Sequence, residues 1–252
     1  MAAEEIIETT VCLNCGCEYA GRYCPQCGQA LQTSSRITMK TFWKSAALSF
    51  SRLTPGFLNT FCGLLTHPWT VIRNYLHGHR IAYSQPVTMV IQLLLYFTFI
   101  YTVLGNIFHV NFLRINRDES PLTAGNWLID MILSSDVISK IAISCLLAFS
   151  CYLTYGNASK RDYNMAEYLT AAIYMACCFA IYSNLLKPLS LLSPAFTMIL
   201  TIAIELVIGT IALNKAFPMH PRWKSAITWL AFMSLNILFL GFLGALIYYL
   251  TN

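Results

Sequence analysis

Residues 86–110 read PVTMVIQLLLYFTFIYTVLGNIFHV, an apolar stretch without a lysine, arginine, aspartate or glutamate. A helix that crosses the hydrocarbon core of a bilayer needs about 20 mostly apolar residues. Because lipid offers no hydrogen-bond partners, a spanning segment must satisfy its own backbone groups, as a helix does. The stretch therefore predicts a transmembrane helix.

Four more apolar stretches of similar length follow, over residues 137–155, 166–186, 189–213 and 226–250. Hydrophobic residues make up 57% of the chain and charged residues only 11%, which lies outside the usual range of soluble globular proteins. We therefore expect an all-α polytopic membrane protein, with about five transmembrane helices between residues 86 and 250.

Lysines and arginines are divided unequally between the loops of this predicted bundle. Most precede residue 86, lie at residues 160–161, or lie between residues 214 and 225, whereas the opposite side holds Arg114, Arg117 and Lys187. Loops rich in lysine and arginine stay in the cytoplasm. The N-terminus is therefore expected in the cytoplasm and the C-terminus outside.

Before the bundle, residues 10–30 contain the near-repeat CLNCG (residues 12–16) and CPQCG (residues 24–28). Each C-x-x-C turn can place two sulfurs on one ion, and two such turns complete the tetrahedral set that Zn²⁺ prefers. We predict a zinc ribbon with these ligands: Cys12, Cys15, Cys24 and Cys27. Four thiolates leave no open coordination position, so the zinc would be structural, and so small a module needs it to fold.

Two other interpretations of these cysteines are a pair of disulfides and a redox C-x-x-C site. A redox motif of the thioredoxin type opens a helix within a βαβ pattern, which the sequence lacks. A reducing cytoplasm also keeps thiols available for metal. Cys17 is an additional thiol, expected to be a bystander because tetrahedral sites take four ligands.

Residues 31–85 are expected to form a cytoplasmic linker followed by amphipathic juxtamembrane helices. Residues 42–53 mix aromatic and aliphatic residues with Lys44 and Arg52, so a helix here could lie in the membrane interface or pack against the bundle. Pro68 suits the first turn of a short helix that Gly78 would close.

A cluster of cations and aromatic residues precedes the first span: Arg73, Tyr75, His77, Arg80 and Tyr83. If the helix continued past Gly78, Arg73, His77 and Arg80 would share one face. Such a cluster could bind lipid phosphate. The alternative is an ordinary juxtamembrane anchor that follows the positive-inside and aromatic-belt rules.

The order of ribbon, amphipathic stretch and a block with prolines at residues 68 and 86 resembles a family of bacterial membrane proteins classed as a domain of unknown function. The block also contains Tyr75, Gly78, Arg80 and Tyr83, and the resemblance covers roughly residues 10–110. It implies the architecture and a location in the bacterial inner membrane. It implies no activity.

Glu205 lies in the apolar sequence IAIELVI, residues 202–208, well inside the expected fourth span. An ionisable residue inside a membrane is a functional candidate by default. Asn236 lies comparably deep in the fifth span, and Asn236 or Asn184 could hydrogen bond to Glu205. Such bonds also act as ordinary packing contacts between helices, so a structural role is the alternative.

The sequence lacks the local signatures of hydrolases, zincins and nucleotide-binding enzymes, so we expect no enzymatic activity. Nucleic-acid binding is not expected either, because the ribbon carries a single cation, Arg22. Two functional classes remain. The first is a scaffold or regulator whose ribbon recruits a cytoplasmic protein; the second is a transporter or channel-like protein with a midplane site at Glu205 and Asn236. Membrane lipids are expected partners in both classes, and a bundle with apolar faces could form a homo-oligomer.

Overall fold

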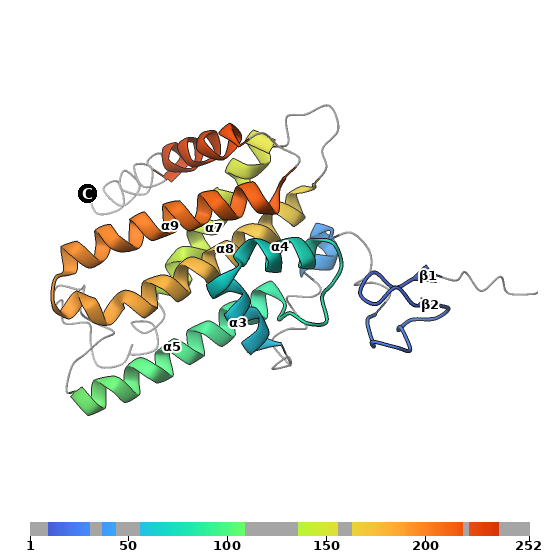
Figure 1. The fold of residues 1–252 in the computed structure, drawn as a ribbon, viewed down its shortest axis with the longest axis horizontal. Helices are drawn as coiled ribbons and strands as arrows, with labels where there is room; N and C mark the ends of the chain where they lie inside the picture. Colours follow the sequence, from blue (N-terminus) through green and yellow to red (C-terminus); the bar gives the residue numbers. More distant parts are fainter. Residues whose placement is uncertain are drawn as a thin grey trace, which may run out of the picture.

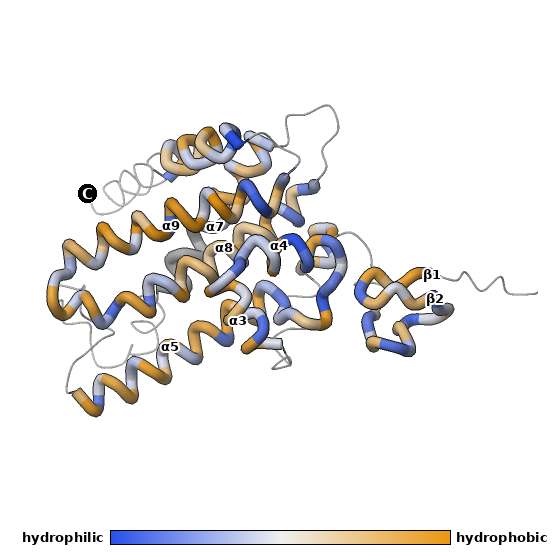
Figure 2. Tube along the Cα trace, viewed as in Figure 1, coloured by the Kyte–Doolittle hydropathy of each residue, from blue (hydrophilic) through white to orange (hydrophobic). Residues whose placement is uncertain are grey.

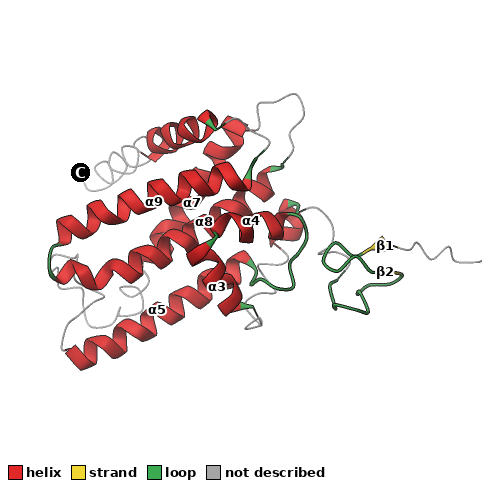
Figure 3. Ribbon diagram, viewed as in Figure 1, coloured by secondary structure: helices red, strands yellow, loops and turns green. Residues whose placement is uncertain are grey.

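The computed structural model describes residues 10–30, 37–43, 56–108, 136–155, 163–218 and 222–236. Most of these residues are helical, and a small two-stranded sheet lies near the start of the chain (Figures 1 and 3). The strands are β1 (Thr10–Val11) and β2 (Glu18–Tyr19), which pair antiparallel. The helices are α3 (Phe57–Thr66), α4 (Pro68–Leu76), α5 (Pro86–Phe108), α7 (Asp136–Tyr155), α8 (Met165–Leu186), the 3-10 helix η1 (Lys187–Leu191) and α9 (Pro194–Ala216). Residues 223–236 are also helical.

Three segments of the described chain are long and apolar enough to cross a membrane: α5, α8 together with η1, and α9. They run along the bundle as mostly apolar helices (Figure 2). These helices indicate a membrane protein. In α7, residues 144–155 form a shorter apolar helix. The expected fifth span, 226–250, falls within the described residues only up to residue 236, so the structure describes fewer spans than the five expected.

The boundaries of the expected span 189–213 differ from the structure. The chain forms η1 up to Leu191 and begins a new helix at Pro194, which runs on to Ala216. Proline lacks a backbone N–H and its ring clashes with the preceding turn, so Pro194 fits the start of a helix and not its interior. Ser193 caps the new helix, because its hydroxyl accepts the Phe196 N–H at 3.4 Å.

α8 is the central helix of the described bundle. It contacts α3, α4, α5, α7 and α9. In the most apolar stretch of the span formed by α8 and η1, 78% of the residues are buried. The corresponding stretches of α5 and α9 have 33% and 22% of their residues buried. A helix that is apolar on all sides is suited to such a position. The fold therefore forms around α8, and α5 and α9 present most of their surface outward.

α3 and α4 are short helices that pack against α8 in the part of the bundle nearer the two-stranded sheet (Figure 1). α4 begins at Pro68 and ends at Leu76, as the sequence predicts. Gly78 has a φ of +101° and closes the helix: its N–H donates to the Tyr75 carbonyl at 3.3 Å, and the His79 N–H donates to the Asn74 carbonyl at 2.9 Å. This is the Schellman arrangement that favours glycine.

The carbonyls at the end of α3 are satisfied by α8. The Cys178 thiol donates to the Leu64 carbonyl at 3.3 Å, and the Tyr182 hydroxyl donates to the Leu65 carbonyl. The last carbonyls of a helix have no partner within the helix itself. The two side chains therefore fix the end of α3 on the central helix.

The predicted amphipathic helix over residues 42–53 lies mostly outside the described residues. Residues 39–43 are helical. Phe42 is buried against the main core, whereas Trp43 is 62% exposed. At Phe42, the structure agrees with the alternative in which this segment packs against the bundle.

Candidate functional site

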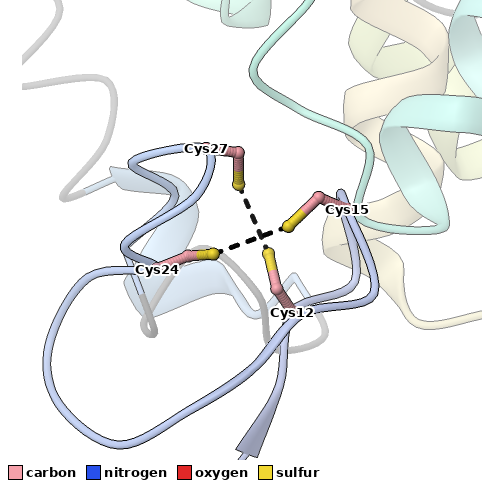
Figure 4. Close-up of side chains that lie close together, drawn as sticks. All are labelled: Cys12, Cys15, Cys24 and Cys27. Atoms are coloured by element: carbon pink, nitrogen blue, oxygen red, sulfur yellow. Dashed lines mark hydrogen bonds between the residues drawn. The ribbon is translucent and has the colours of Figure 1, made fainter.

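Four cysteine side chains point toward one centre in the N-terminal module (Figure 4). The Cys12 and Cys27 sulfurs lie 3.5 Å apart, as do the Cys15 and Cys24 sulfurs, and all four lie within 4.8 Å of one another. Metal–sulfur bonds of about 2.3 Å in a tetrahedron place the sulfurs about 3.8 Å apart. The cluster therefore has the size and the donor set to hold a metal ion.

The two C-x-x-C turns have the same backbone hydrogen bonds. In each turn the N–H of the first cysteine donates to the carbonyl of the residue five positions later. The N–H of the glycine that follows the second cysteine donates to the carbonyl of the first cysteine. The distances are 2.9 and 2.8 Å in the first turn and 2.9 Å for both bonds in the second. Gly16 and Gly28 have φ of +77° and +74°, a conformation that costs glycine little.

Cys17 lies outside the group of four and its thiol donates to the Glu18 carbonyl at 3.4 Å. Within the group, desolvation raises the pKa of the Cys24 thiol. Hydrogen bonds from the backbone N–H groups of Cys27 and Gln26 and from the neighbouring thiols outweigh this effect. They lower the pKa of the Cys24 thiol to about 6. The neighbouring Cys15 thiol, 3.5 Å from the Cys24 sulfur, has its pKa raised to about 12. Of this pair, Cys24 is therefore the residue that can present a thiolate to a cation near neutral pH.

The cysteine module contacts the loop between α4 and α5. The Gln29 side-chain amide donates to the Gly78 carbonyl at 3.0 Å in a buried position. The Leu13 side chain lies directly against Gly78, because a Cβ atom added there would be 2.8 Å from the Leu13 Cβ. Leu13 lies within the first C-x-x-C turn and Gln29 directly follows the second, so both turns take part in the contact. The sequence predicts Gly78 as a helix cap, but no local pattern in it indicates this contact.

The five predicted juxtamembrane residues do not form one surface. Arg73 and His77 are exposed, whereas Tyr75 is buried and its ring meets the Tyr174 ring of α8 edge to face at 5.2 Å. The Tyr83 hydroxyl accepts the Asn74 side-chain amide at 3.0 Å. The shared face required α4 to continue past Gly78, and the chain turns there instead.

Arg80 is directed into the protein. Its guanidinium carbon lies 5.5 Å from the centre of the Tyr75 ring, and its Nε donates to the Tyr75 carbonyl at 3.2 Å. Burial lowers the pKa of Arg80. The hydroxyl groups of Tyr75 and Tyr174 and the Glu167 carboxylate partly offset this effect, because each of them favours the charged guanidinium. Arg80 therefore belongs to a polar cluster between the juxtamembrane loop and α8.

Glu167 and Asn164 begin α8 with a reciprocal capping box. The Glu167 N–H donates to the Asn164 side-chain oxygen at 3.0 Å, and the Asn164 N–H donates to the Glu167 carboxylate at 2.8 Å. The Asn164 side-chain amide also donates to the Ile37 carbonyl at 2.6 Å. This capping box was not predicted, although the spacing N-x-x-E before an apolar helix is a recognisable signal.

A second missed contact joins α4 to the end of α9. The Lys215 ammonium lies 4.0 Å from the centre of the Trp69 ring, and the His67 ring lies 5.2 Å from the same ring. Ammonium groups are attracted to the faces of tryptophan rings. The end of α9 is therefore held at the same end of the bundle as α3 and α4.

A cavity of about 260 Å³ lies between α7, α8, α9 and the helix at residues 223–236. Glu205 and Asn236 both line it, so the structure brings the two predicted intramembrane polar residues to one place. Ser144 of α7 and Trp229 add further polar atoms. The Asn236 side-chain amide donates to the Phe232 carbonyl at 2.8 Å, and that of Asn184 donates to the Ala180 carbonyl at 2.7 Å within α8.

Trp229 is among the residues that line this cavity. Gly209 of α9 makes room for it, since a Cβ atom there would be 2.4 Å from the Trp229 ring. The indole N–H is buried and, within the described part of the chain, has no hydrogen-bond acceptor. A buried indole N–H usually has a partner.

The chain is thus a mostly helical membrane protein with a four-cysteine cluster that can hold a metal ion. Residues 55–101 match a family described as a protein of unknown function (DUF3667). The matched segment runs from α3 through α4 into α5 and includes the loop that contacts the cysteine module. The expected resemblance to a domain of unknown function is therefore confirmed for residues 55–101. The match covers neither the ribbon nor the bacterial origin that was expected. No curated protein and no solved structure matches the chain.

Proposed function

We propose that this protein is a non-enzymatic scaffold or regulator of the bacterial inner membrane, whose cytoplasmic zinc ribbon recruits a soluble protein. The observation that carries the proposal is the contact of both C-x-x-C turns with the loop between α4 and α5. A ribbon fixed in this way presents its remaining surface at a defined place beside the membrane. It can therefore connect a soluble partner to the bundle.

Zinc is the metal that suits the four-sulfur cluster best. Tetrahedral sites of four thiolates are typical of structural zinc. A cytoplasmic ribbon lies in a reducing compartment, where its cysteines remain thiols. The cytoplasmic location follows from the distribution of lysines and arginines.

The outer surface of the ribbon offers apolar contacts for a partner. Tyr23 is 65% exposed and Val11 is 51% exposed. Tyrosine is enriched in the centres of protein interfaces. The exposed Arg73 of α4 and the exposed His77 that follows this helix can in addition contact acidic lipid headgroups beside the ribbon.

The test compares the wild-type chain with a Cys12→Ser, Cys15→Ser double variant, both purified from membranes in mild detergent. We expect about one zinc ion per wild-type chain, none in the variant, and a soluble protein that copurifies only with the wild type. Binding of that purified protein to the wild-type chain in nanodiscs then establishes direct recruitment. Tyr23→Ser should weaken this binding while the chain keeps its zinc.

A Glu205→Gln variant is the matched control in the bundle, and it should bind the soluble partner as the wild type does. Loss of zinc without any change in copurifying proteins would contradict the recruitment function. Loss of partner binding in Glu205→Gln would place the interaction in the bundle instead of the ribbon.

A second candidate function, transport of a solute, is favoured by one specific observation. Glu205 and Asn236 line the same cavity near the middle of the bundle. In proteoliposomes, a transporter would show a pH-dependent flux that Glu205→Gln abolishes and that persists after removal of residues 1–35. A flux that is unchanged in Glu205→Gln would exclude this site as its path.

A further inference from the structure

The end of α9 carries a cation at the level of the membrane surface. α9 is a candidate span from Pro194 to Ala216, and Lys215 lies in its last turn. The end of such a helix lies beside the lipid headgroups, because its apolar length matches the hydrocarbon core. Lys215 is exposed, and its ammonium group lies 4.0 Å from the centre of the Trp69 ring. The contact between α4 and α9 therefore places both side chains in the headgroup region.

An exposed apolar stripe leads along α9 to this lysine. Val207, Ile211 and Lys215 follow one another at intervals of four residues, and all three are exposed. Residues at this spacing are neighbours on the surface of a helix, and α9 is mostly apolar (Figure 2). From Val207 to Lys215 the helix rises about 12 Å, close to the ~15 Å of hydrocarbon in one leaflet. An acyl chain can therefore lie along the stripe while its headgroup meets Lys215.

A second cation lies one turn along α4 from the Trp69 ring. Trp69 and Arg73 are four residues apart, so they are neighbours on the helix surface, and Arg73 is exposed. No aspartate or glutamate occurs in residues 19–117 or 206–252, which supply α4 and this end of α9. The exposed surface formed by Lys215, Trp69 and Arg73 is therefore positive, and its charge is complementary to that of a phosphate group.

The Trp69 ring holds the Lys215 ammonium in place before any ligand binds. An ammonium group is attracted to the face of an indole ring. The His67 ring lies 5.2 Å from the same indole and restricts its movement. A side chain that is already ordered loses less entropy when it binds a ligand. Lys215 is therefore better prepared to bind a headgroup than a lysine that extends freely into solvent.

We propose that Lys215, Trp69 and Arg73 form a binding site for one acidic glycerophospholipid. The phosphate oxygens accept hydrogen bonds from the ammonium and guanidinium groups, and the indole lies beside the glycerol backbone, the depth that tryptophan prefers. One acyl chain lies along Val207 and Ile211. The site goes beyond the recruitment function and is independent of it, because none of its residues belongs to the ribbon.

The test counts lipids bound to the full chain in mild detergent by native mass spectrometry. The probes are phosphatidylglycerol and phosphatidylcholine with identical acyl chains. A soluble probe, glycerophosphoglycerol, has the headgroup of phosphatidylglycerol without its acyl chains. We expect one phosphatidylglycerol to bind per chain about tenfold more tightly than phosphatidylcholine. Glycerophosphoglycerol should not compete at the same concentration, because it lacks the apolar contacts.

Three substitutions assign the contacts. Lys215→Met and Arg73→Met each remove one cation and should weaken phosphatidylglycerol binding about fivefold, with little effect on phosphatidylcholine. Lys215→Arg keeps the charge and should retain the binding.

Lys187→Met is the matched control. The Lys187 ammonium also lies over an aromatic ring, 5.3 Å from the centre of the Tyr101 ring, but in η1, the element that precedes α9. This variant should bind phosphatidylglycerol as the wild type does. Thermal unfolding of each variant verifies that the bundle is intact.

Four outcomes would overturn the site. An equal loss of phosphatidylglycerol in Lys187→Met and Lys215→Met would show an effect of total charge. Equal binding of the two lipids, or unchanged binding in the Lys215→Met, Arg73→Met double variant, would show that these cations do not select an acidic headgroup. Competition by glycerophosphoglycerol at the concentration of the lipid would assign the surface to a soluble phosphate compound. The zinc content and the soluble partner, measured in the same samples, test the recruitment function separately.

Discussion

Gly78 combines two roles at a single residue. Its φ of +101° closes α4, and its missing side chain leaves room for Leu13 of the ribbon. Only glycine serves both roles, because other residues disfavour positive φ and any Cβ atom would collide with Leu13.

Gly78→Ala is therefore expected to lower the free energy of unfolding by about 1 kcal/mol or more. It should also expose the ribbon to proteolysis, which limited digestion in detergent measures. Leu13→Gly in the same chain removes the Leu13 Cβ and should relieve the collision but not the backbone strain. Strictly additive effects of the two substitutions would contradict the contact.

The two arginines of the juxtamembrane segment have opposite environments. Arg80 lies among Tyr75, Tyr174 and Glu167, whereas Arg73 is exposed. Removing one partner of a buried charge cluster leaves the remaining charge uncompensated.

We expect Arg80→Met to destabilise the protein by about 3 kcal/mol. The matched substitution Arg73→Met should stay within about 0.5 kcal/mol of the wild type. Chemical unfolding in mixed micelles, followed by tryptophan fluorescence, measures both. Equal effects would show that Arg80 is not part of a cohesive buried cluster.

At the scale of elements, the contact between α9 and the helix at residues 223–236 depends on Gly209. The Trp229 ring occupies the space where a side chain would project, and it also contacts the Phe179 ring with centroids 6.3 Å apart. Close approach of helices at small residues is a common form of packing in membranes.

Gly209→Val is expected to cost about 1–3 kcal/mol through overpacking and to change the shape of the cavity. Ala203→Val makes a similar small-to-large change at an exposed position of the same helix and should cost little. Thermal unfolding in detergent distinguishes the two variants. A stable Gly209→Val protein with unchanged tryptophan fluorescence would contradict this packing.

Some elements could be predicted from the sequence, and the reason is local. The apolar lengths of α5, α8 and α9 identify membrane-spanning helices, Pro68 and Gly78 delimit α4, and the repeated C-x-x-C spacing identifies the four clustered cysteines. The start of α9 at Pro194 was missed because hydropathy alone continues smoothly through η1. A proline signal was present there.

Contacts between distant segments could not be predicted in the same way. Arg80 turns inward because Tyr174 and Glu167 of α8 lie beside it, some 90 residues later in the chain. Leu13 and Gln29 reach Gly78 across a comparable gap, and neither has a pattern of its own. The meeting of Glu205 and Asn236 at one cavity likewise depends on how α9 and the next helix are packed.

At the scale of the whole molecule, the ribbon and the bundle have separate sources of stability. The cysteine module has a very small core formed around Cys12, Tyr19 and Cys24, whereas the bundle has a large one around α8. So small a module would need a bound metal ion to fold.

The Cys24→Ser, Cys27→Ser variant is therefore expected to lose the zinc proposed for this cluster and to become protease-sensitive within residues 10–30. The unfolding temperature of the bundle should change by only a few degrees. Cys17→Ser should keep the zinc, because Cys17 lies outside the cluster. A bundle that unfolds together with the ribbon would show that the two form one cooperative unit.

The central position of α8 also has a consequence for biogenesis. The ribosome completes α8 before α9 and before residues 223–236, so part of the surface that covers α8 is synthesised after it. Until those segments arrive, the Tyr168 ring of α8 lacks its contact with the Phe217 ring, and the Phe179 ring lacks its contact with the Trp229 ring. We therefore expect the nascent chain to be retained beside the insertion machinery until α9 has been made, and chains that stop before α9 to be degraded.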